Sequence, residues 1–310
     1  MKVGLVGLGP IGLEVGKVLV ASPAFEFVGA ADLSSRLVGR GLGELLPGAP
    51  AGLKVEPRLA GVLALRPEAV VLCTRSLFRE VAEDLAAIVA AGAHAVTSCE
   101  ELASPPEDPE ARALHEAAER AGVAILATGV NPGFVMDRWP LQLAAMCVSV
   151  QGVVVERVVD AGQRREPLRN KVGHGLSSEE FQAAVAAGRV GHVGLRASAT
   201  LLARGLGTEL ASAEEDIIPV TGADGRTLGV RQELRGRTAD DRPIELRLQM
   251  SVGAPVPHDR VILDADPPID ARVVGGLHGD RATVAALVEG LRRLSRPSPR
   301  AGLLTIADLY

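Results

Sequence analysis

Three glycines near the start of the chain most constrain what it can fold into. Gly7, Gly9 and Gly12 form G-x-G-x-x-G, directly after the apolar run Lys2–Val6 and at the start of a helical pattern that continues to Ala21. In a dinucleotide-binding fold the first glycine permits a tight turn, the second lets the backbone approach a pyrophosphate, and the third allows close helix–strand packing. The motif in this context predicts a Rossmann dinucleotide-binding domain.

The segment after the second predicted strand, Phe25–Ala31, bears on the choice of cofactor. Asp32 follows this strand, where a carboxylate accepts hydrogen bonds from the adenosine ribose and favours NAD. Ser35 and Arg36 are instead what the 2′-phosphate of NADP prefers, so we expect NAD or NADP, with NAD favoured. The alternative is a glycine-rich turn without a ligand. The residues predicted to bind the cofactor are Gly7, Gly9, Pro10, Ile11, Gly12, Asp32, Ser35, Arg36, Thr74 and Asn131.

Strand-like and helical patterns alternate up to about residue 130. Buried strands are indicated at Ala69–Cys73, Ala95–Ser98 and Val123–Leu126. Ser76 is expected to cap the helix that follows the first of these strands, and Asp108 is expected to begin the helix that follows the second. Such alternation implies parallel βαβ units in a doubly wound sheet.

The pattern changes from about residue 148. Val153–Val159, Arg226–Arg237 and Arg242–Val252 alternate as strands of a mainly antiparallel sheet with one buried face, and Ser177 begins a capping box. The last helix is expected from Asp280 until before Pro297. We therefore predict an α/β protein with a Rossmann domain at 1–137, a substrate-binding and dimerisation α+β domain at 138–279, and a C-terminal helix at 280–310.

Composition excludes several classes of partner. Hydrophobic residues make up 47% of the chain and aromatic residues only 2%, so few side chains can stack on nucleic-acid bases. The net charge of −5 also argues against a nucleic-acid partner. No apolar run reaches the ~18 residues of a membrane span. The N-terminus is expected to be a strand and not a signal peptide.

The three cysteines, Cys73, Cys99 and Cys147, lie far apart in the sequence. An odd number is a poor disulfide framework, and no pair has the spacing of metal ligands. We expect a reduced, cytoplasmic protein without a metal.

Two adjacent carboxylates follow the predicted strand Ala95–Ser98. Consecutive side chains point to opposite sides, so only one of Glu100 and Glu101 can face a nicotinamide at this edge of the sheet. Many two-domain NAD(P) oxidoreductases carry Glu-Lys-Pro in a similar segment, with the lysine facing the substrate. By that alignment Glu101 replaces the lysine and Glu100 is its structural partner. The alternative is that both side chains are solvated caps of the following loop.

Further polar candidates lie in turns. Asn131 follows the strand that ends at Leu126 and is a candidate contact to nicotinamide or substrate, although Asn-Pro-Gly also forms a turn without any function. His192 lies between glycines, which suggests close packing beside the ring. We predict Glu101, His192 and Asn131 as catalytic residues. The cations Arg164, Arg165 and Lys171 form either a surface patch or the mouth of a cleft, and His174, His258 and His278 are expected to be structural.

Taken together, these motifs resemble the 2,4-diaminopentanoate dehydrogenase family, which includes NAD(P)-dependent amine dehydrogenases and is distantly similar to dihydrodipicolinate reductase. The resemblance covers nearly the whole chain. It rests on Cys99–Leu102, Gly129–Phe134 with Met136–Asp137, Arg164–Arg165 with Pro167–Leu168, Gly191–Leu195, and Gly279–Asp280 with Ala282–Thr283.

The resemblance implies reversible oxidative deamination of a primary amine or diamine to a ketone or aldehyde and ammonia. It also implies a homodimer, a C-terminal helix that packs back on the Rossmann domain, and a catalytic carboxylate at Glu101. After Leu195 the chain departs from the family with Arg196–Ser198, and the final helix departs at Val288–Leu291. Two alternatives stay open, an imine reductase like dihydrodipicolinate reductase and a non-catalytic NAD(P)-sensing protein.

Overall fold

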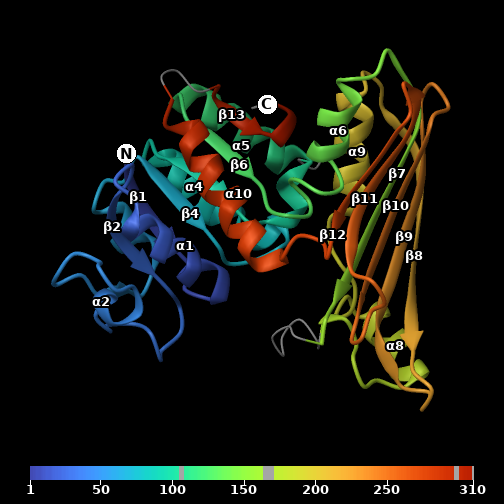
Figure 1. Cartoon of the computed structure of the whole chain (residues 1–310). Coiled ribbons are helices and arrows are strands. Elements are labelled where there is room, and N and C mark those ends of the chain that lie inside the picture. The colour runs from blue at the N-terminus through green and yellow to red at the C-terminus, as the bar shows by residue number, and fades with distance from the viewer. Residues whose placement is uncertain (105–107, 163–170, 297–299, 309–310) are drawn as a thin grey trace. The chain divides into compact units, whose positions relative to one another are not determined.

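The computed structural model describes residues 1–104, 108–162, 171–296 and 300–308. The chain divides into two compact units, Met1–Gly133 with Gly279–Tyr310, and Phe134–His278 (Figure 1). The domain boundaries predicted after residues 137 and 279 stay a prediction. Each unit is described below by itself.

The first unit contains a seven-stranded sheet in the order β13-β6-β5-β4-β1-β2-β3, and all neighbouring strands run parallel. Its strands are β1 (Lys2–Val6), β2 (Glu26–Ala31), β3 (Val55–Glu56), β4 (Ala69–Leu72), β5 (His94–Thr97), β6 (Ala124–Ala127) and β13 (Gly302–Leu304). The strand order reverses between β1 and β4, and ligands of such sheets bind at the carboxyl ends of the strands beside that point. The predicted α/β class with a Rossmann sheet is confirmed.

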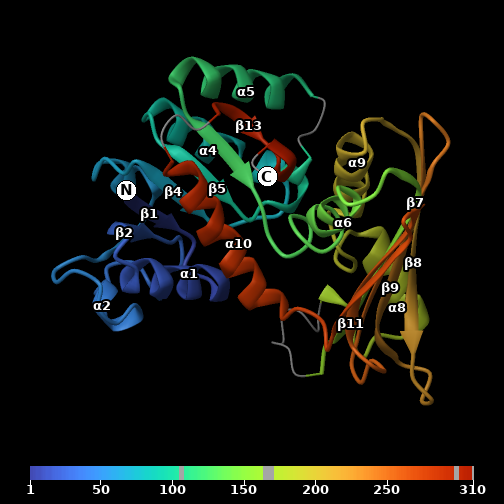
Figure 2. The same ribbon diagram turned by 45° about the horizontal axis from the view of Figure 1, so that its top comes forward.

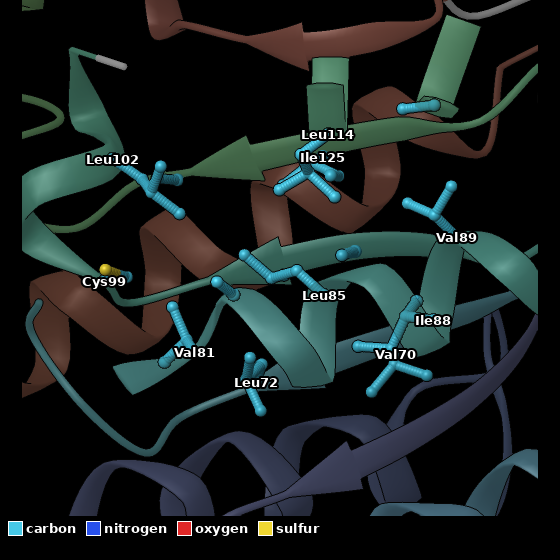
Figure 3. Close-up of a cluster of buried hydrophobic side chains, with 14 of the residues drawn as sticks. Val70, Leu72, Val81, Leu85, Ile88, Val89, Cys99, Leu102, Leu114 and Ile125 are labelled. Carbon is cyan, nitrogen blue, oxygen red and sulfur yellow. The ribbon is translucent and has the colours of Figure 1, made fainter. Parts of the chain in front are cut away.

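Helices cover both faces of this sheet. One face carries α1 (Pro10–Ala21), α2 (Leu42–Leu45) and α10 (Gly279–Leu294), and α1 lies beside α10 although the two are far apart in sequence (Figure 2). The other face carries α3 (Leu59–Leu63), α4 (Ala82–Ala90) and α5 (Pro109–Ala121). The aliphatic side chains between these helices and the sheet are buried, and Figure 3 shows part of this core around Leu85 and Ile125.

Two predicted helix starts had different outcomes. Asp108 caps α5 as predicted, since its side chain accepts a hydrogen bond from the backbone N–H of Ala111. The prediction that Ser76 caps the next helix is wrong. A short 3₁₀ helix, η1 (Phe78–Glu80), comes first, and α4 begins only at Ala82 without a side-chain cap.

The second unit contains a six-stranded sheet in the order β12-β11-β7-β10-β9-β8. Only β7 and β10 pair in parallel within it, so the predicted mainly antiparallel sheet is confirmed. Helices α6, α8 and α9 pack on the strands, and the predicted capping box at Ser177 is present. The elements are β7 (Ser149–Asp160), β8 (Leu210–Thr221), β9 (Thr227–Thr238), β10 (Pro243–Ser251), β11 (His258–Asp266), β12 (Ile269–Val274), α6 (Arg138–Ala144), α8 (Ser178–Ala186) and α9 (Leu195–Gly205).

Candidate functional site

The glycine motif forms the turn between β1 and α1. Gly7 has a φ of +90°, and a Cβ atom there would lie 2.4 Å from the carbonyl oxygen of Cys73. A Cβ atom on Gly12 would lie 1.8 Å from the carbonyl oxygen of Gly7, so the helix approaches the strand more closely than any side chain allows. Gly9 differs, because a Cβ atom there would meet nothing within 4 Å. Two glycines are thus required by packing, whereas Gly9 leaves open the space in front of the helix.

Asp32 joins the end of β2 to this turn. Its Oδ2 accepts a hydrogen bond from the backbone N–H of Leu8 at 2.6 Å, and its Oδ1 accepts one from Ser34 at 2.7 Å. Each carboxylate oxygen retains a further lone pair for a ligand hydroxyl. Ser35 and Arg36 are exposed on the turn that follows. The structure therefore brings the predicted acidic residue against the glycine turn.

A cavity of about 360 Å³ lies at the carboxyl ends of the central strands of the first unit. Five segments of that unit supply its walls: the start of α1, the ends of β4, β5 and β6, and the start of α10. The lining residues are Gly9, Pro10, Ile11, Cys73, Thr74, Arg75, Ser76, Ser98, Cys99, Glu100, Ala103, Thr128, Gly129, Asn131, Pro132, Asp280 and Thr283.

Five of the residues predicted to bind the cofactor line this cavity, namely Gly9, Pro10, Ile11, Thr74 and Asn131. Gly7 and Gly12 support the turn behind it. Asp32, Ser35 and Arg36 follow β2 and are not among the lining residues. The predicted set is thus divided between the cavity and the neighbouring turn, which is the arrangement that an extended dinucleotide requires.

The two adjacent glutamates lie in different surroundings. Glu100 lines the cavity, whereas Glu101 is not among its lining residues. Glu101 instead accepts a hydrogen bond on Oε2 from the backbone N–H of Phe78 at 2.6 Å, and its own N–H donates to the carbonyl of Ser76 at 3.1 Å. The sequence led us to expect Glu101 to face the cavity and Glu100 to support it. In the structure Glu100 lines the cavity, and the Glu101 side chain is hydrogen-bonded to the loop after β4.

The turn after β6 contributes two buried polar side chains to the cavity. Asn131 is 8% exposed and Thr128 is 4% exposed. The hydroxyl oxygen of Thr128 has no hydrogen-bond partner within the described part of the chain. A buried hydroxyl without a partner is costly, so this atom is suited to a ligand that supplies one. The start of α10 supports the turn, because Oγ1 of Thr283 accepts a hydrogen bond from Val130 at 3.3 Å.

Sequence reasoning missed several lining residues. Neither Thr128, which directly precedes the quoted motif Gly129–Phe134, nor Arg75 is assigned a role from the sequence. Thr283 is named for the resemblance alone, and Asp280 only for the resemblance and as the start of the last helix. The signal that could have found them is position, since each lies directly after a predicted strand or at the start of a predicted helix.

The cysteines that line the cavity are poor nucleophiles. Burial raises the pKa of the Cys73 thiol to about 12, and burial also raises that of Cys99 to about 12, to which the charges of Glu101 and Glu100 contribute. The thiol of Cys99 donates a hydrogen bond to the carbonyl of Ser76 at 3.2 Å. Both thiols are therefore protonated at neutral pH, and their contribution to the cavity is packing.

His192 belongs to the second unit, so it is placed only relative to its own neighbours there. The side chain of Gln232 holds the backbone on both sides, accepting from the His192 N–H and donating to its carbonyl, each at 2.8 Å. Gly191 before it has a φ of +119° and donates to the carbonyl of Lys171. His258 is the first residue of β11. Arg164, Arg165 and Pro167 lie outside the described residues.

Residues 1–104, 108–162, 171–296 and 300–308 contain neither a metal-binding cluster nor a membrane-spanning helix. No group of three or more His, Cys, Asp or Glu side chains in these ranges could hold a metal ion. Within the same ranges, no helix has the length and apolar character needed to cross a membrane.

Comparison with known proteins supports the resemblance found in the sequence. Residues 134–249 match the model of the 2,4-diaminopentanoate dehydrogenase C-terminal domain. The chain is 28% identical over 220 residues to the 2,4-diaminopentanoate dehydrogenase of Acetoanaerobium sticklandii; the match covers 68% of this chain and spans 62% of the length of that curated relative. The resemblance to that family is thereby confirmed.

Solved structures show the same fold. The amine dehydrogenase from Mycobacterium smegmatis superimposes with a TM-score of 0.85 at 21% identity, covering 100% of this chain and 96% of that chain. GenD2 from gentamicin A biosynthesis, solved in complex with NAD, superimposes with a TM-score of 0.63 at 18% identity. The match covers 100% of this chain and 91% of that chain. At these identities the likeness concerns the fold alone.

Proposed function

We propose that this chain is an NAD(P)-dependent amine dehydrogenase that catalyses the reversible oxidative deamination of a primary amine or diamine to a ketone or aldehyde and ammonia. The observation that carries the proposal is a cavity that begins at the glycine turn of a Rossmann sheet and has a carboxylate, Glu100, in its wall. The names of the diaminopentanoate and amine dehydrogenases that the chain is similar to support the same reaction class.

The residues present fit a nicotinamide dinucleotide. The empty space in front of Gly9 and the first N–H groups of α1 suit a pyrophosphate, because a helix N-terminus attracts negative charge. The hydroxyl of Thr128, which has no hydrogen-bond partner within the described residues, and the side chain of Asn131 line the same cavity, where we place the nicotinamide. Asp32 favours NAD over NADP, because its charge repels a 2′-phosphate. The bound cofactor would supply the redox chemistry as acceptor or donor of the hydride.

The protein would contribute proton transfer and orientation. A primary amine is protonated at neutral pH, and an ammonium nitrogen has no lone pair with which to expel a hydride. A carboxylate from the pair Glu100 and Glu101 would take that proton and would stabilise the cationic iminium that follows. We propose that Asn131 and His192 position the substrate or the nicotinamide.

A cofactor-reduction screen tests the proposal. Purified protein with NAD or NADP is supplied with alkylamines, diamines and amino acids, and the reverse reaction with ketones and ammonium. Ammonia-dependent turnover of any ketone supports an amine dehydrogenase. Reduction of a cyclic imine without added ammonium would favour the imine reductase, and tight cofactor binding without any turnover would favour the sensor.

Two further predictions remain proposals. We propose a homodimer, for which the second unit offers an exposed sheet face that carries ion pairs such as Arg247–Glu156 and Arg260–Asp270. Sedimentation velocity would test it, and a single monomeric species at micromolar concentration would refute it. We also propose a cytoplasmic location, from the cysteine argument, which cell fractionation would test.

A further inference from the structure

We infer that the two adjacent glutamates have separate duties: Glu100 is the carboxylate that takes the substrate proton, and Glu101 is a positioning residue that ties two cavity loops together. The assignment of Glu100 rests on the proposed function. The assignment of Glu101 rests on hydrogen bonds alone. It reverses the order expected from the alignment with Glu-Lys-Pro.

The local backbone separates the two side chains. Glu100–Ala103 form a 3₁₀ helix, η2, in which successive residues are turned by about 120°. The flanking residues Cys99 and Leu102 are 1% and 0% exposed and belong to the buried cluster that also holds Val81 and Leu85 (Figure 3). With those directions taken by the core, the two glutamates cannot point the same way.

Glu101 connects the loop after β5 to the loop after β4. Its carboxylate accepts from the N–H of Phe78 at 2.6 Å, and its N–H donates to the carbonyl of Ser76 at 3.1 Å. The thiol of Cys99 donates to that same carbonyl at 3.2 Å. The side chain of Phe78 is 3% exposed, so its backbone N–H is held in place by the core. Ser76 lines the cavity, and Glu101 therefore acts on the site through the loop it fixes.

Glu100 has the position that proton transfer needs. It shares the cavity wall with Asn131 and Thr128, beside the segment where the nicotinamide side of a dinucleotide ends in this fold. In the step proposed, an N–H bond of the substrate ammonium breaks and an O–H bond forms on the Glu100 carboxylate. The nitrogen keeps the electron pair, and nothing is oxidised or reduced in this step.

Three variants separate the duties. Glu100→Gln should lower turnover by ~10²–10⁴-fold and remove the acidic limb of the pH–rate profile, with unchanged cofactor affinity. Glu101→Gln keeps an oxygen that accepts from Phe78, so we expect turnover to fall by no more than a few-fold and the acidic limb to remain. Glu101→Ala leaves that N–H without an acceptor, so Tm and NADH affinity should both fall. Glu116→Gln, on the exposed face of α5, is the matched control.

The outcomes distinguish this inference from the proposed function. Loss of turnover and of the acidic limb in Glu101→Gln, with both retained in Glu100→Gln, would overturn it. Equal Tm and NADH affinity in Glu101→Ala and Glu101→Gln would refute the positioning role. If the wild-type protein oxidises no amine, the proposed function and the proton role of Glu100 fail together, while the Tm and NADH titration of the Glu101 variants still decide the positioning role.

Discussion

The cavity has two ends that differ in how the chain specifies them. At the cofactor end, Gly7 and Gly12 are needed because backbone atoms occupy the space of a side chain. At the end beside Glu100, side chains are oriented by hydrogen bonds between distant segments, such as Val130 to Thr283 across 153 residues. The first end depends on the absence of side chains, and the second depends on their direction.

The largest effect is expected from a contrast within the glycine motif. Gly9→Val should abolish measurable cofactor binding while Tm stays near the wild-type value, because the added side chain enters open space where a pyrophosphate would lie. Gly12→Ala places a Cβ atom 1.8 Å from a backbone oxygen, so it should cost about 3 kcal/mol of stability or more. Calorimetric titration and thermal unfolding measure the two effects. Cofactor affinity within a few-fold of wild type in Gly9→Val would end the assignment of this turn.

A smaller effect is expected at Asp32. Asp32→Ala removes the charge that opposes a 2′-phosphate, so the preference for NAD over NADP should shift toward NADP by about tenfold, equivalent to about 1.4 kcal/mol. It also leaves the N–H groups of Leu8 and Ser34 without their acceptor, which should lower Tm. Asp32→Asn keeps an acceptor and is the control for that loss. Kinetics with both cofactors decide, and an unchanged ratio would mean that Asp32 does not face the ribose.

The difference between the two ends also explains what the sequence could predict. The alternation of strand and helix patterns around Ala69–Cys73 and Ala95–Ser98 was enough to predict the parallel sheet, because buried strands are recognised by their short length and their β-branched residues. The glycine turn could be predicted equally well, because glycine marks positions where the backbone leaves no room for a side chain. Each of these features is encoded by residue type over a short stretch.

The order of Glu100 and Glu101 could not be predicted in the same way. The sequence assigned a capping role to the Ser76 side chain, but the N–H group at the start of η1 takes its acceptor from Glu101. The wrong cap and the inferred exchange of the two glutamates thus have one physical cause, an acceptor supplied from a neighbouring strand end. Thr283 was missed for a similar reason, because its partner Val130 lies on a different part of the chain.

The hydrogen bond between Val130 and Thr283 tests the end of the cavity that depends on contacts between distant segments. Thr283→Val keeps the shape but removes the acceptor for the Val130 N–H, a loss of about 1 kcal/mol. We expect kcat to fall several-fold as the Asn131 turn loosens, with little change in cofactor preference. Thr283→Ser keeps the hydroxyl and should restore most of the activity. Equal kcat in the Val and Ser variants would show that this hydrogen bond does not position the turn.

The smallest effect concerns His94, at the amino end of β5 and thus at the opposite end of the strand from Glu100. Its Nδ1 accepts a hydrogen bond from the backbone N–H of Ala124 at 3.0 Å, which requires an unprotonated nitrogen. Burial lowers the pKa of His94 below its usual 6.5, against a smaller opposing effect of Glu68. The unfolded chain therefore binds the proton first, and stability is lost as the pH falls from about 6.5 toward the lower folded value.

The loss of folding stability at low pH can be measured separately from the pH dependence of turnover. One titrating group changes stability by at most about 1.4 kcal/mol per pH unit, and above pH 6.5 it should contribute nothing. His94→Asn offers an oxygen to Ala124 but does not titrate, so its Tm should fall less than that of the wild type between pH 7.5 and 5.5. The acidic limb of turnover should remain in this variant, because we assign that limb to Glu100, which follows the other end of β5. If the limb disappeared with His94, it would report unfolding, and the assignment of a base in the cavity would lose its kinetic evidence.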